Sequence, residues 1–284
     1  MLPFSPSATA QRVALSRAAH QLWDSPQVLG DPVALRLVGA QAGAALARGG
    51  LKKHSRLLRS LRAFLVARSR FAEDQLAQSL ARGVRQYVVL GAGLDTFAYR
   101  NPHAAAGLRV WEVDHPATQA YKREQLATAG IAVPDNTTYV PIDFRSQSLP
   151  EQLQRHGFDA HLPSFFSWLG VSMYLEPATV LDTLRWVATA TPPGSGIAMD
   201  YMLPMAQQPW PMRAALGVLA LGVAAHGEPW RGFFDPVLLA QSLRAMGYHT
   251  VIDWDGDAIN RTYFTERRDG LRTGGSGHLL CAIH

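Results

Sequence analysis

An apolar run that breaks into closely spaced glycines is the feature that most constrains this chain. The segment VVLGAGLDTFAYR, residues 88–100, begins with an apolar run typical of a buried strand. Gly91-Ala92-Gly93 follows this run, and an acid comes next at Asp95. Glycine allows positive φ angles and a close approach of the backbone to a ligand. In α/β sheets, ligands bind where the parallel strands end. The segment therefore predicts a glycine turn that holds a cofactor.

Strand and helix patterns alternate after Arg85 and predict an α/β fold. The apolar runs alternate with helical patterns, two of which begin at Pro116 and Pro177, and Asp235-Pro236 is typical of another helix start. This order predicts a mostly parallel sheet with right-handed crossovers. The expected strands occupy residues 86–93, 108–116, 137–144, 164–175, 194–202, 248–254 and 278–284.

The chain divides by composition into two parts. Residues 10–84 show helical spacing interrupted at Pro26, Asp31-Pro32 and Gly49-Gly50, which predicts an N-terminal helical cap over residues 1–84. Residues 85–284 are the expected cofactor-binding core. Within that core, an irregular segment at about 203–234 is rich in Pro, Trp and Met, and is interpreted as a lid insertion after the fifth strand.

Bulk properties are those of a globular protein without a membrane span. Of the 284 residues, 48% are hydrophobic and 17% charged. The single cysteine, Cys281, rules out an intrachain disulfide, and the N-terminus has no secretory pattern, so a cytoplasmic location is expected. The most apolar stretch, residues 214–225, is too short to cross a bilayer.

Positive charge is concentrated between Arg48 and Arg85. This stretch has ten basic residues and two acids, and Lys52, Arg56 and Arg59 recur at helical spacing. One interpretation is a solvated helix face. The alternative is a docking surface for an acidic partner, such as an acyl carrier protein or an RNA.

The residues around the turn discriminate between cofactors. A dinucleotide fingerprint needs a small residue where this chain has Thr96, and Asp95 puts negative charge where a pyrophosphate needs donors. No Gly-Lys-Ser/Thr phosphate loop follows. Glu112 and Asp114 end the next strand, where an acid can hold a ribose. These features favour S-adenosylmethionine over NAD or FAD. Asp95 could also simply cap the following helix, and Glu112 could pair with a neighbouring cation.

Three segments, QYVVLGAGLDTFAYR, VWEVDHPATQAYKREQL and FFSWLGVSMYL, together resemble the leucine carboxyl methyltransferase family, and in particular its bacterial branch of S-adenosylmethionine-dependent methyltransferases. The resemblance runs from the N-terminal helices to the last strand. It implies a class I methyltransferase: a Rossmann-like seven-stranded sheet whose last strand is antiparallel, with an N-terminal helical extension and a lid insertion after strand five.

The resemblance also implies roles for individual residues. Either Arg68 or Arg70 would clamp the methionine carboxylate of the cofactor. Asp114 would hold the ribose, with Glu112 beside it, and Asp143 and Phe144 would contact the adenine. The other expected cofactor contacts come from the glycine turn and the end of the fourth strand: Gly91, Ala92, Gly93, Asp95 and Leu169.

This chain departs from the family pattern at Phe97, where many relatives have arginine, and at Leu169, where relatives often have an acid. Roles of those side chains therefore cannot be transferred. Tyr174, Asp200 and Tyr201 are expected near the reacting methyl group, and the two tyrosines are expected to act in positioning rather than in proton transfer. The expected substrate contacts are Trp210, His226, Trp230 and Arg231. The sequence shows no His/Cys cluster at metal-ligand spacing.

We therefore expect an O-methyltransferase that modifies a carboxylate or phenolic hydroxyl of a small, apolar or aromatic natural product. Two alternatives remain open. The enzyme could act on a protein carboxyl, a carrier-protein-bound substrate or RNA, although a nucleic-acid partner is not the main expectation. It could also bind the cofactor and serve only as an inactive interaction protein.

Overall fold

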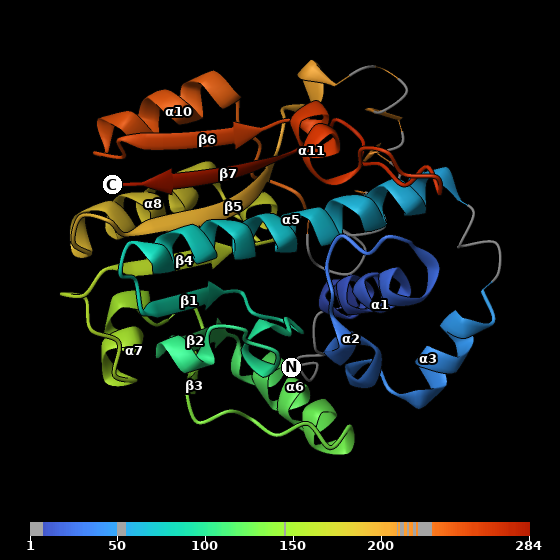
Figure 1. Ribbon diagram of the computed structural model, residues 1–284. Helices are drawn as coiled ribbons and strands as arrows, with labels where there is room; N and C mark the ends of the chain where they lie inside the picture. The colour runs from blue at the N-terminus through green and yellow to red at the C-terminus, as the bar shows by residue number, and fades with distance from the viewer. Residues whose placement is uncertain are drawn as a thin grey trace.

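The computed structural model describes residues 8–49, 55–144, 146–208, 210, 213–214, 216–217, 220 and 229–284. Its centre is a seven-stranded sheet in the order β3-β2-β1-β4-β5-β7-β6 (Figure 1). Strand β7 pairs antiparallel with both β5 and β6, and the pairings among the first five strands are parallel. The class I methyltransferase fold expected from the sequence is confirmed. The strands are β1 Gln86–Leu90, β2 Arg109–Asp114, β3 Thr137–Pro141, β4 Ser164–Trp168, β5 Gly196–Met202, β6 Thr250–Trp254 and β7 Gly277–Ile283.

Helices cover both faces of this sheet. Three of them, α6, α8 and α10, begin at the prolines that the sequence predicts, and α7 also has a proline in its first turn. Asp235 caps α10 by accepting from the backbone N–H of Val237 and Leu238. Two short helices, α7 and α11, are not anticipated by the sequence patterns. The helices of the core are α6 Pro116–Thr128, α7 Leu149–Arg155, α8 Pro177–Ala190, α10 Pro236–Ala245 and α11 Gly256–Tyr263.

The N-terminal part is helical as expected. It contains α1 Ala8–Trp23, α2 Pro32–Leu37, α3 Ala40–Ala47 and the long α5 Arg56–Ala81. Short 3₁₀ turns, η1 Phe97–Tyr99, η2 Ala104–Ala106, η3 Ser172–Tyr174 and η4 Met205–Gln207, lie in the loops of the core. Helix α5 lies along the sheet and contacts β4, β5 and β7, so it covers part of one face of the core (Figure 1). It also contacts α1 of the N-terminal part.

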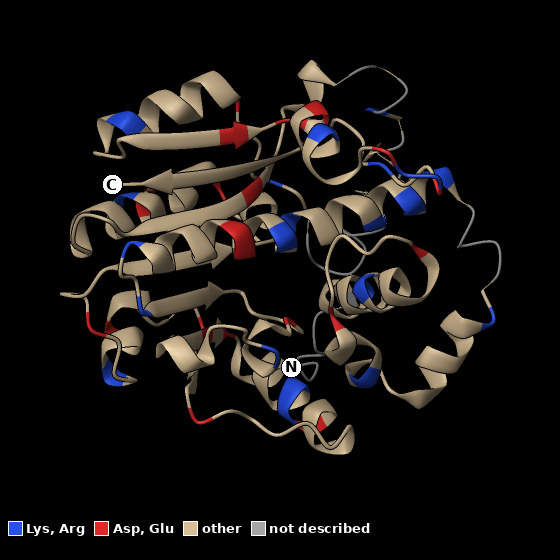
Figure 2. Cartoon of the chain, viewed as in Figure 1, with Lys and Arg blue, Asp and Glu red and all other residues tan. Residues whose placement is uncertain are grey.

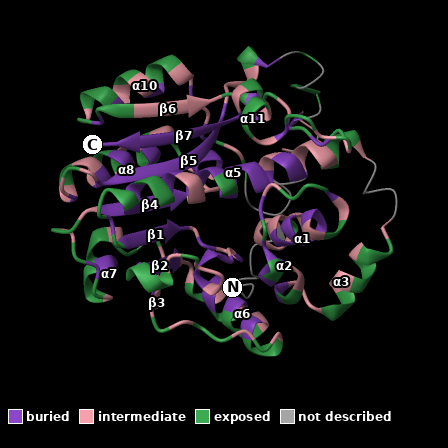
Figure 3. Ribbon diagram, in the orientation of Figure 1, coloured by how far each residue is buried: buried purple, intermediate pink, exposed green. Residues whose placement is uncertain are grey.

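The strands are buried on both faces, which explains their nearly continuous apolar sequences. One hydrophobic cluster packs beneath α5 and includes Phe71, Phe165 and Cys281. A second cluster on the opposite face includes Phe166 and Leu184. Figure 3 shows the buried strands between helices that are exposed on their outer sides. This arrangement fixes the strand ends and therefore the loops that carry the candidate site.

Figure 2 shows basic residues spaced along α5. They do not form one solvated face. Arg62 and Arg68 are buried and pair with Asp24 and Asp200. Lys52 lies outside the described residues, so its expected place on a face with Arg56 and Arg59 has no structural description. Internal ion pairs therefore account for part of the charge that suggested a docking surface.

No helix in the described ranges combines the length and the apolar character needed to cross a membrane.

Candidate functional site

The glycine turn after β1 is shaped by close packing against the loop after β4. Gly91 has φ +66°, a backbone conformation that residues with a Cβ rarely adopt. A Cβ added to Gly91 would also lie only 2.4 Å from Cγ2 of Val171. Glycine is therefore required here both by the backbone conformation and by the opposing loop.

A cavity of about 350 Å³ opens beside this turn. The loops after β1, β2, β3 and β4 meet there, because parallel strands end at one edge of the sheet. The cavity thus brings together the expected contacts from four different strand ends. Those residues are Gly91, Ala92, Gly93, Asp95, Asp114, Asp143, Phe144, Leu169 and Tyr174, joined by Arg68 from α5.

Asp114 lies at the end of β2, beside the glycine turn. Its two carboxylate oxygens accept backbone hydrogen bonds from Gly93, at 2.5 Å, and from His115, at 2.6 Å. Burial raises the pKa of the Asp114 carboxyl despite these two hydrogen bonds. Each carboxylate oxygen has a further lone pair, so the group can still accept from a ligand hydroxyl.

Glu112 does not line the cavity, contrary to the expectation that it sits beside the ribose. It is buried, and one of its oxygens lies 2.7 Å from the Lys122 ammonium and 3.1 Å from the Tyr99 hydroxyl. Burial raises the pKa of Glu112, and Lys122 opposes that shift. Its role is the one considered as an alternative: an internal ion pair with a neighbouring cation.

Asp95 lines the cavity, but its charge is already matched by an internal cation. Its carboxylate accepts from Arg17 at 3.0 Å and from the backbone N–H of Phe97 at 2.8 Å. Burial alone would raise the pKa of Asp95, but Arg17, Lys122 and Arg100 hold it below its ordinary value. Asp95 thus accepts from the first backbone N–H of η1, whose N-cap residue is Thr96, and it offers a cationic ligand less negative charge than the sequence suggests.

The structure distinguishes the two candidate arginines on α5. Arg68 is buried, lines the cavity and donates from Nη1 to Oδ2 of Asp200 at 3.0 Å. Arg70 has a side chain that is 47% exposed and pairs with Asp74, one turn along the same helix. Two residues correspond to about 200° of helix rotation, so the two arginines point in opposite directions. Arg68 alone of the pair can contact a ligand in this cavity.

Asp200, which is expected near the reacting methyl group, is not among the residues that line the cavity, but it contacts Arg68, which does line it. It lies at the end of β5 and is fully buried, where it accepts from Arg68 and, at 2.5 Å, from the backbone N–H of Gly170. It therefore holds the Arg68 guanidinium against the loop after β4. The sequence signal is an acid inside an otherwise apolar strand.

Tyr201 does not reach the cavity, contrary to expectation. Successive side chains of a strand point to opposite faces of the sheet, and Asp200 occupies the face toward α5. Tyr201 packs against Phe234 on the other face and donates to the Asp253 carboxylate. Tyr174, the other expected positioning residue, does line the cavity.

Helix α1 contributes a wall of the cavity that sequence reasoning missed. Thr9, Ala10, Val13 and Arg17 share one helix face and line the cavity. A Cβ added to Gly93 would lie 3.3 Å from the Cβ of Ala10, so α1 packs directly on the glycine turn. The helical spacing of these residues in the sequence could have indicated that they share one face.

The N-terminal helices are tied to the turn by a buried carboxylate. Asp31 caps α2 by accepting from the backbone N–H of Ala34 at 3.0 Å. Its other oxygen, Oδ2, accepts from the Thr96 hydroxyl at 2.6 Å, and Nε of Arg100 lies 3.5 Å from the capping oxygen, Oδ1. Asp31 therefore fixes the position of the helical cap relative to the residues that follow the turn.

The end of the cavity formed by the loop after β3 is open. Asp143 is half-buried after β3, and Phe144 has 59% of its surface exposed. Both residues line the cavity, as expected. A ligand stacked on Phe144 would cover apolar surface that is otherwise left in water.

The expected substrate contacts separate into different environments. Trp230 packs in an apolar cluster with Met173, Met202 and Tyr174. Trp210 is 76% exposed, and Arg231 forms an exposed ion pair with Glu176 at 3.0 Å. His226 lies outside the described residues. Trp230 therefore packs against the same cluster as Tyr174, which lines the cavity, whereas neither Trp210 nor Arg231 belongs to this cluster.

Within the described part of the chain, no group of three or more His, Cys, Asp or Glu residues could hold a metal ion.

Residues 10–188 match the leucine carboxyl methyltransferase family. The chain is 29% identical over 297 residues to a Bacillus subtilis protein named "Putative S-adenosyl-L-methionine-dependent methyltransferase YktD", covering 98% of this chain and 97% of that protein. A Mycobacterium marinum protein described in the same words is 34% identical over 70% of this chain and 67% of its own length. The fold is similar to a crystal structure of a "putative methyltransferase" from Thermobifida fusca, with a TM-score of 0.57 at 18% identity, covering 98% of this chain and 95% of that one.

Proposed function

The chain belongs to the leucine carboxyl methyltransferase family and is an S-adenosylmethionine-dependent methyltransferase, and from this premise we propose that it methylates an oxygen of a small, apolar or aromatic metabolite. The acceptor oxygen is a carboxylate or a phenolic hydroxyl. The observation that carries the proposal is the continuity between the cofactor cavity and the apolar cluster around Trp230, which share Tyr174.

The residues of the cavity fit the cofactor. A volume of about 350 Å³ lies within the roughly 300–1,000 Å³ typical of small-molecule sites. From the loop after β4 to the loop after β3 there are three strand spacings, about 14 Å, which suits an extended amino-acid nucleoside. The close approach of Gly91 to Val171 leaves no room for a side chain at this part of the cavity wall.

We assign one part of the cofactor to each region of the cavity. Arg68 would hold the methionine carboxylate with the paired N–H groups of its guanidinium, because Arg68 lines the cavity and Arg70 does not. Asp114 would accept from the ribose hydroxyls. Asp143 would accept from the adenine amine, and Phe144 would pack on its ring.

When bound, S-adenosylmethionine supplies a methyl group on a positively charged sulfur, which a nucleophile displaces in line. The chain's contribution is then mainly to orient the acceptor and to exclude water. Tyr174 would shape the space between the cofactor and the acceptor. A carboxylate acceptor is already ionised near neutral pH and needs no general base, whereas a phenol with a pKa of about 10 gains from one.

The apolar cluster supports the substrate class. Met173, Met202, Trp230 and Tyr174 offer aliphatic and aromatic surface for a ring or chain. The indole N–H of Trp230 is buried and has no hydrogen-bond partner among the described residues. A substrate oxygen at this position would satisfy a donor that is costly to leave unpaired. Arg231 is held by Glu176, so it adds little attraction for an anionic substrate.

The test uses the purified enzyme and methyl-labelled cofactor. Fractionated small-molecule extract is incubated with the enzyme, and labelled products are isolated and treated with alkali. A methyl ester releases labelled methanol, whereas an aryl methyl ether retains its label, so the chemistry of the acceptor is identified directly. Arg68→Lys is the variant expected to lose turnover, and Arg70→Lys is its matched control.

Label found only in the macromolecular fraction would contradict the small-molecule acceptor. A labelled N-methyl or S-methyl product would contradict O-methylation. Neither result would affect the assignment of the cofactor, which calorimetric binding of S-adenosylhomocysteine tests separately.

A further inference from the structure

Arg17 is the residue through which helix α1 contacts the segment that follows the glycine turn. Its Nη1 donates to Oδ2 of Asp95 at 3.0 Å, and its Nη2 donates to the backbone carbonyl of Leu94. The Arg17 side chain is only 3% exposed, and all three residues line the cofactor cavity. One guanidinium group on α1 therefore binds two consecutive residues of the cavity wall.

The hydrogen bonds of Arg17 go to this segment and not to a second carboxylate that lies nearby. Nε of Arg17 is 3.9 Å from Oδ2 of Asp31, which is beyond hydrogen-bond distance, and it has no hydrogen-bond partner among the described residues. A buried donor that is left without a partner costs free energy. The position of the guanidinium group is therefore set by its contacts with Leu94 and Asp95.

Asp95 depends on Arg17 for the orientation and the charge of its carboxylate. Its Oδ1 accepts from the backbone N–H of Phe97 at 2.8 Å, and Arg17 is the ion-pair partner of Oδ2. Burial would raise the pKa of Asp95, and among the nearby cations Arg17 lowers it most. Without this cation, the carboxylate would have to turn toward water or take up a proton.

The segment held by Arg17 is continuous with groups that we assign to the cofactor. Gly93 directly precedes Leu94 and donates its N–H to Asp114, the proposed ribose acceptor. The N–H of Asp95 donates to the carbonyl of Ala92 at 2.7 Å and so closes the turn. A shift of Leu94 and Asp95 would therefore move the glycine turn, and a misplacement of about 1 Å at such a site can cost roughly 100-fold.

We propose that Arg17 is a positioning residue of the cofactor site, which holds the glycine turn and Asp95 in the arrangement that binds S-adenosylmethionine. Thr9, Ala10 and Val13 of the same helix also line the cavity, so binding of the cofactor and docking of α1 favour each other. The proposal rests on the assignment of this cavity to the cofactor and is independent of the methyl acceptor.

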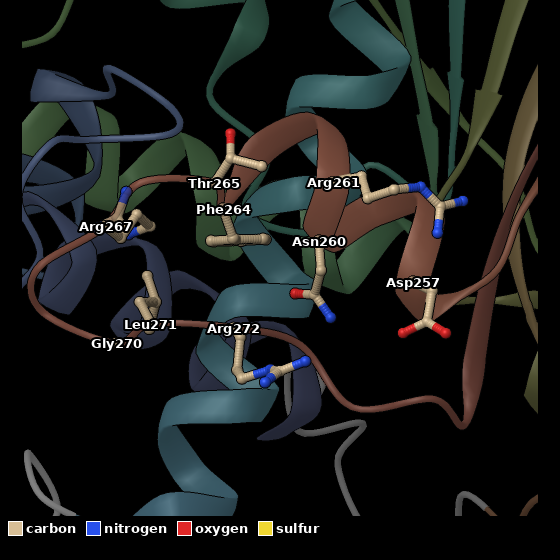
Figure 4. A pocket seen from close by; sticks show the side chains of 9 residues that line it. All are labelled: Asp257, Asn260, Arg261, Phe264, Thr265, Arg267, Gly270, Leu271 and Arg272. Carbon is tan, nitrogen blue, oxygen red and sulfur yellow. The ribbon is translucent and has the colours of Figure 1, made fainter.

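Arg267 is a matched control, because it makes the same kinds of contact away from the cofactor. Its side chain is also 3% exposed; it contacts the Asp269 carboxylate, at 2.9 Å from Nε, and donates to the carbonyl of Pro26, shortly after α1. Arg267 lines a separate cavity beside α11 (Figure 4), and no residue lines both this cavity and that of the cofactor. If arginines that join the N-terminal part to the core had only a structural role, both residues would matter equally.

Calorimetric titration with S-adenosylhomocysteine compares the two lysine variants. Arg17→Lys should weaken binding about tenfold, because an ammonium group cannot reproduce the planar fork that spans Leu94 and Asp95. Arg267→Lys should change binding less than about twofold, even where thermal unfolding shows an equal loss of stability. Hydrogen exchange gives a second readout: S-adenosylhomocysteine should slow the exchange of α1 amides in the wild type, and slow it less in Arg17→Lys.

A double-mutant cycle tests whether Arg17 acts through Asp95. Arg17→Gln and Asp95→Asn should each weaken binding of S-adenosylhomocysteine, since each leaves a buried charge without its partner. The double variant has neither charge. It should therefore bind at least about fivefold more tightly than the sum of the two single changes predicts.

Three results would overturn the proposal: equal effects of Arg17→Lys and Arg267→Lys on binding, additive effects in the cycle, and α1 exchange that does not respond to S-adenosylhomocysteine. Arg68→Lys distinguishes this proposal from the assignment of the cavity. If Arg68→Lys weakens binding and Arg17→Lys does not, only the role of Arg17 fails. If neither variant weakens binding, the assignment of the cavity to the cofactor fails as well.

Discussion

Arg68 on α5 and Asp200 at the end of β5 form a buried ion pair, with Nη1 and Oδ2 separated by 3.0 Å. Asp200 also accepts from the backbone N–H of Gly170, so one carboxylate joins a helix, a strand end and the loop after β4. Arg68 lines the cofactor cavity, and a Cβ on Gly170 would come within 2.7 Å of its guanidinium. The pair therefore fixes a cation at the cavity wall before any ligand arrives.

Arg68→Lys should weaken S-adenosylhomocysteine binding at least about tenfold, because lysine keeps the charge but loses the planar fork. Retaining the charge matters, since removing it would leave the buried Asp200 carboxylate without a cationic partner and would destabilise the fold. Arg70→Lys should change binding by less than about twofold, because Arg70 is exposed and contacts Asp74. Calorimetry on both variants measures the difference, and a larger effect from Arg70→Lys would refute the assignment.

Gly91→Ala should lower the free energy of unfolding by about 2–4 kcal/mol, from backbone strain at positive φ and from the clash with Val171. Adding Val171→Ala should recover only the steric part of this loss, about 1–2 kcal/mol. Denaturant unfolding of the two single variants and the double variant gives the coupling energy. Simple additivity of the two changes would mean that the contact does not restrict Gly91.

Tyr201→Phe should leave S-adenosylhomocysteine binding unchanged, because the Tyr201 hydroxyl bonds to Asp253 on the face of β5 away from the cavity. It should cost about 1–3 kcal/mol of stability, since Asp253 loses a donor. Tyr174→Leu should instead weaken binding about tenfold by removing part of the cavity wall. Paired calorimetry and thermal unfolding separate the two effects. The assignment fails if Tyr201→Phe reduces binding and Tyr174→Leu does not.

Asp24 should contribute to acid stability. Burial alone would raise the pKa of Asp24, but hydrogen bonds from Arg62 and His20 lower it to about 2. The folded pKa is thus below the unfolded value of about 3.9, so this stabilisation, about 2 kcal/mol, is present above pH 4 and lost as the pH falls toward 2. The unfolding free energy of Asp24→Asn should be lower at pH 7 and should lack this step. A wild-type step of equal size in the variant would contradict the assignment.

The sequence determined the sheet, the glycine turn and the acids at the strand ends. The strand patterns predicted seven strands, and because parallel strands end at one edge, Asp114 was expected near Gly91 without knowledge of the contacts between them. The place of Asp143 was expected from the family resemblance alone. Gly91 could also be identified locally, since a turn of this kind requires a residue that tolerates positive φ.

Only the tertiary structure decided which side chains face the cavity. The sequence alone does not distinguish Arg68 from Arg70 as the arginine at the cavity. The orientation of α5 on the sheet places Arg68 in the cavity wall and Arg70 outside it. The same holds for neighbours on a strand: the two faces of β5 are both buried, so burial alone could not show that Asp200 would turn toward α5 and Tyr201 away from it. The tertiary structure likewise brings Glu112 into an ion pair with Lys122, which lies ten residues later on α6. Sequence spacing fixes the positions along an element, but the rotation of that element about its axis is set by packing against distant residues.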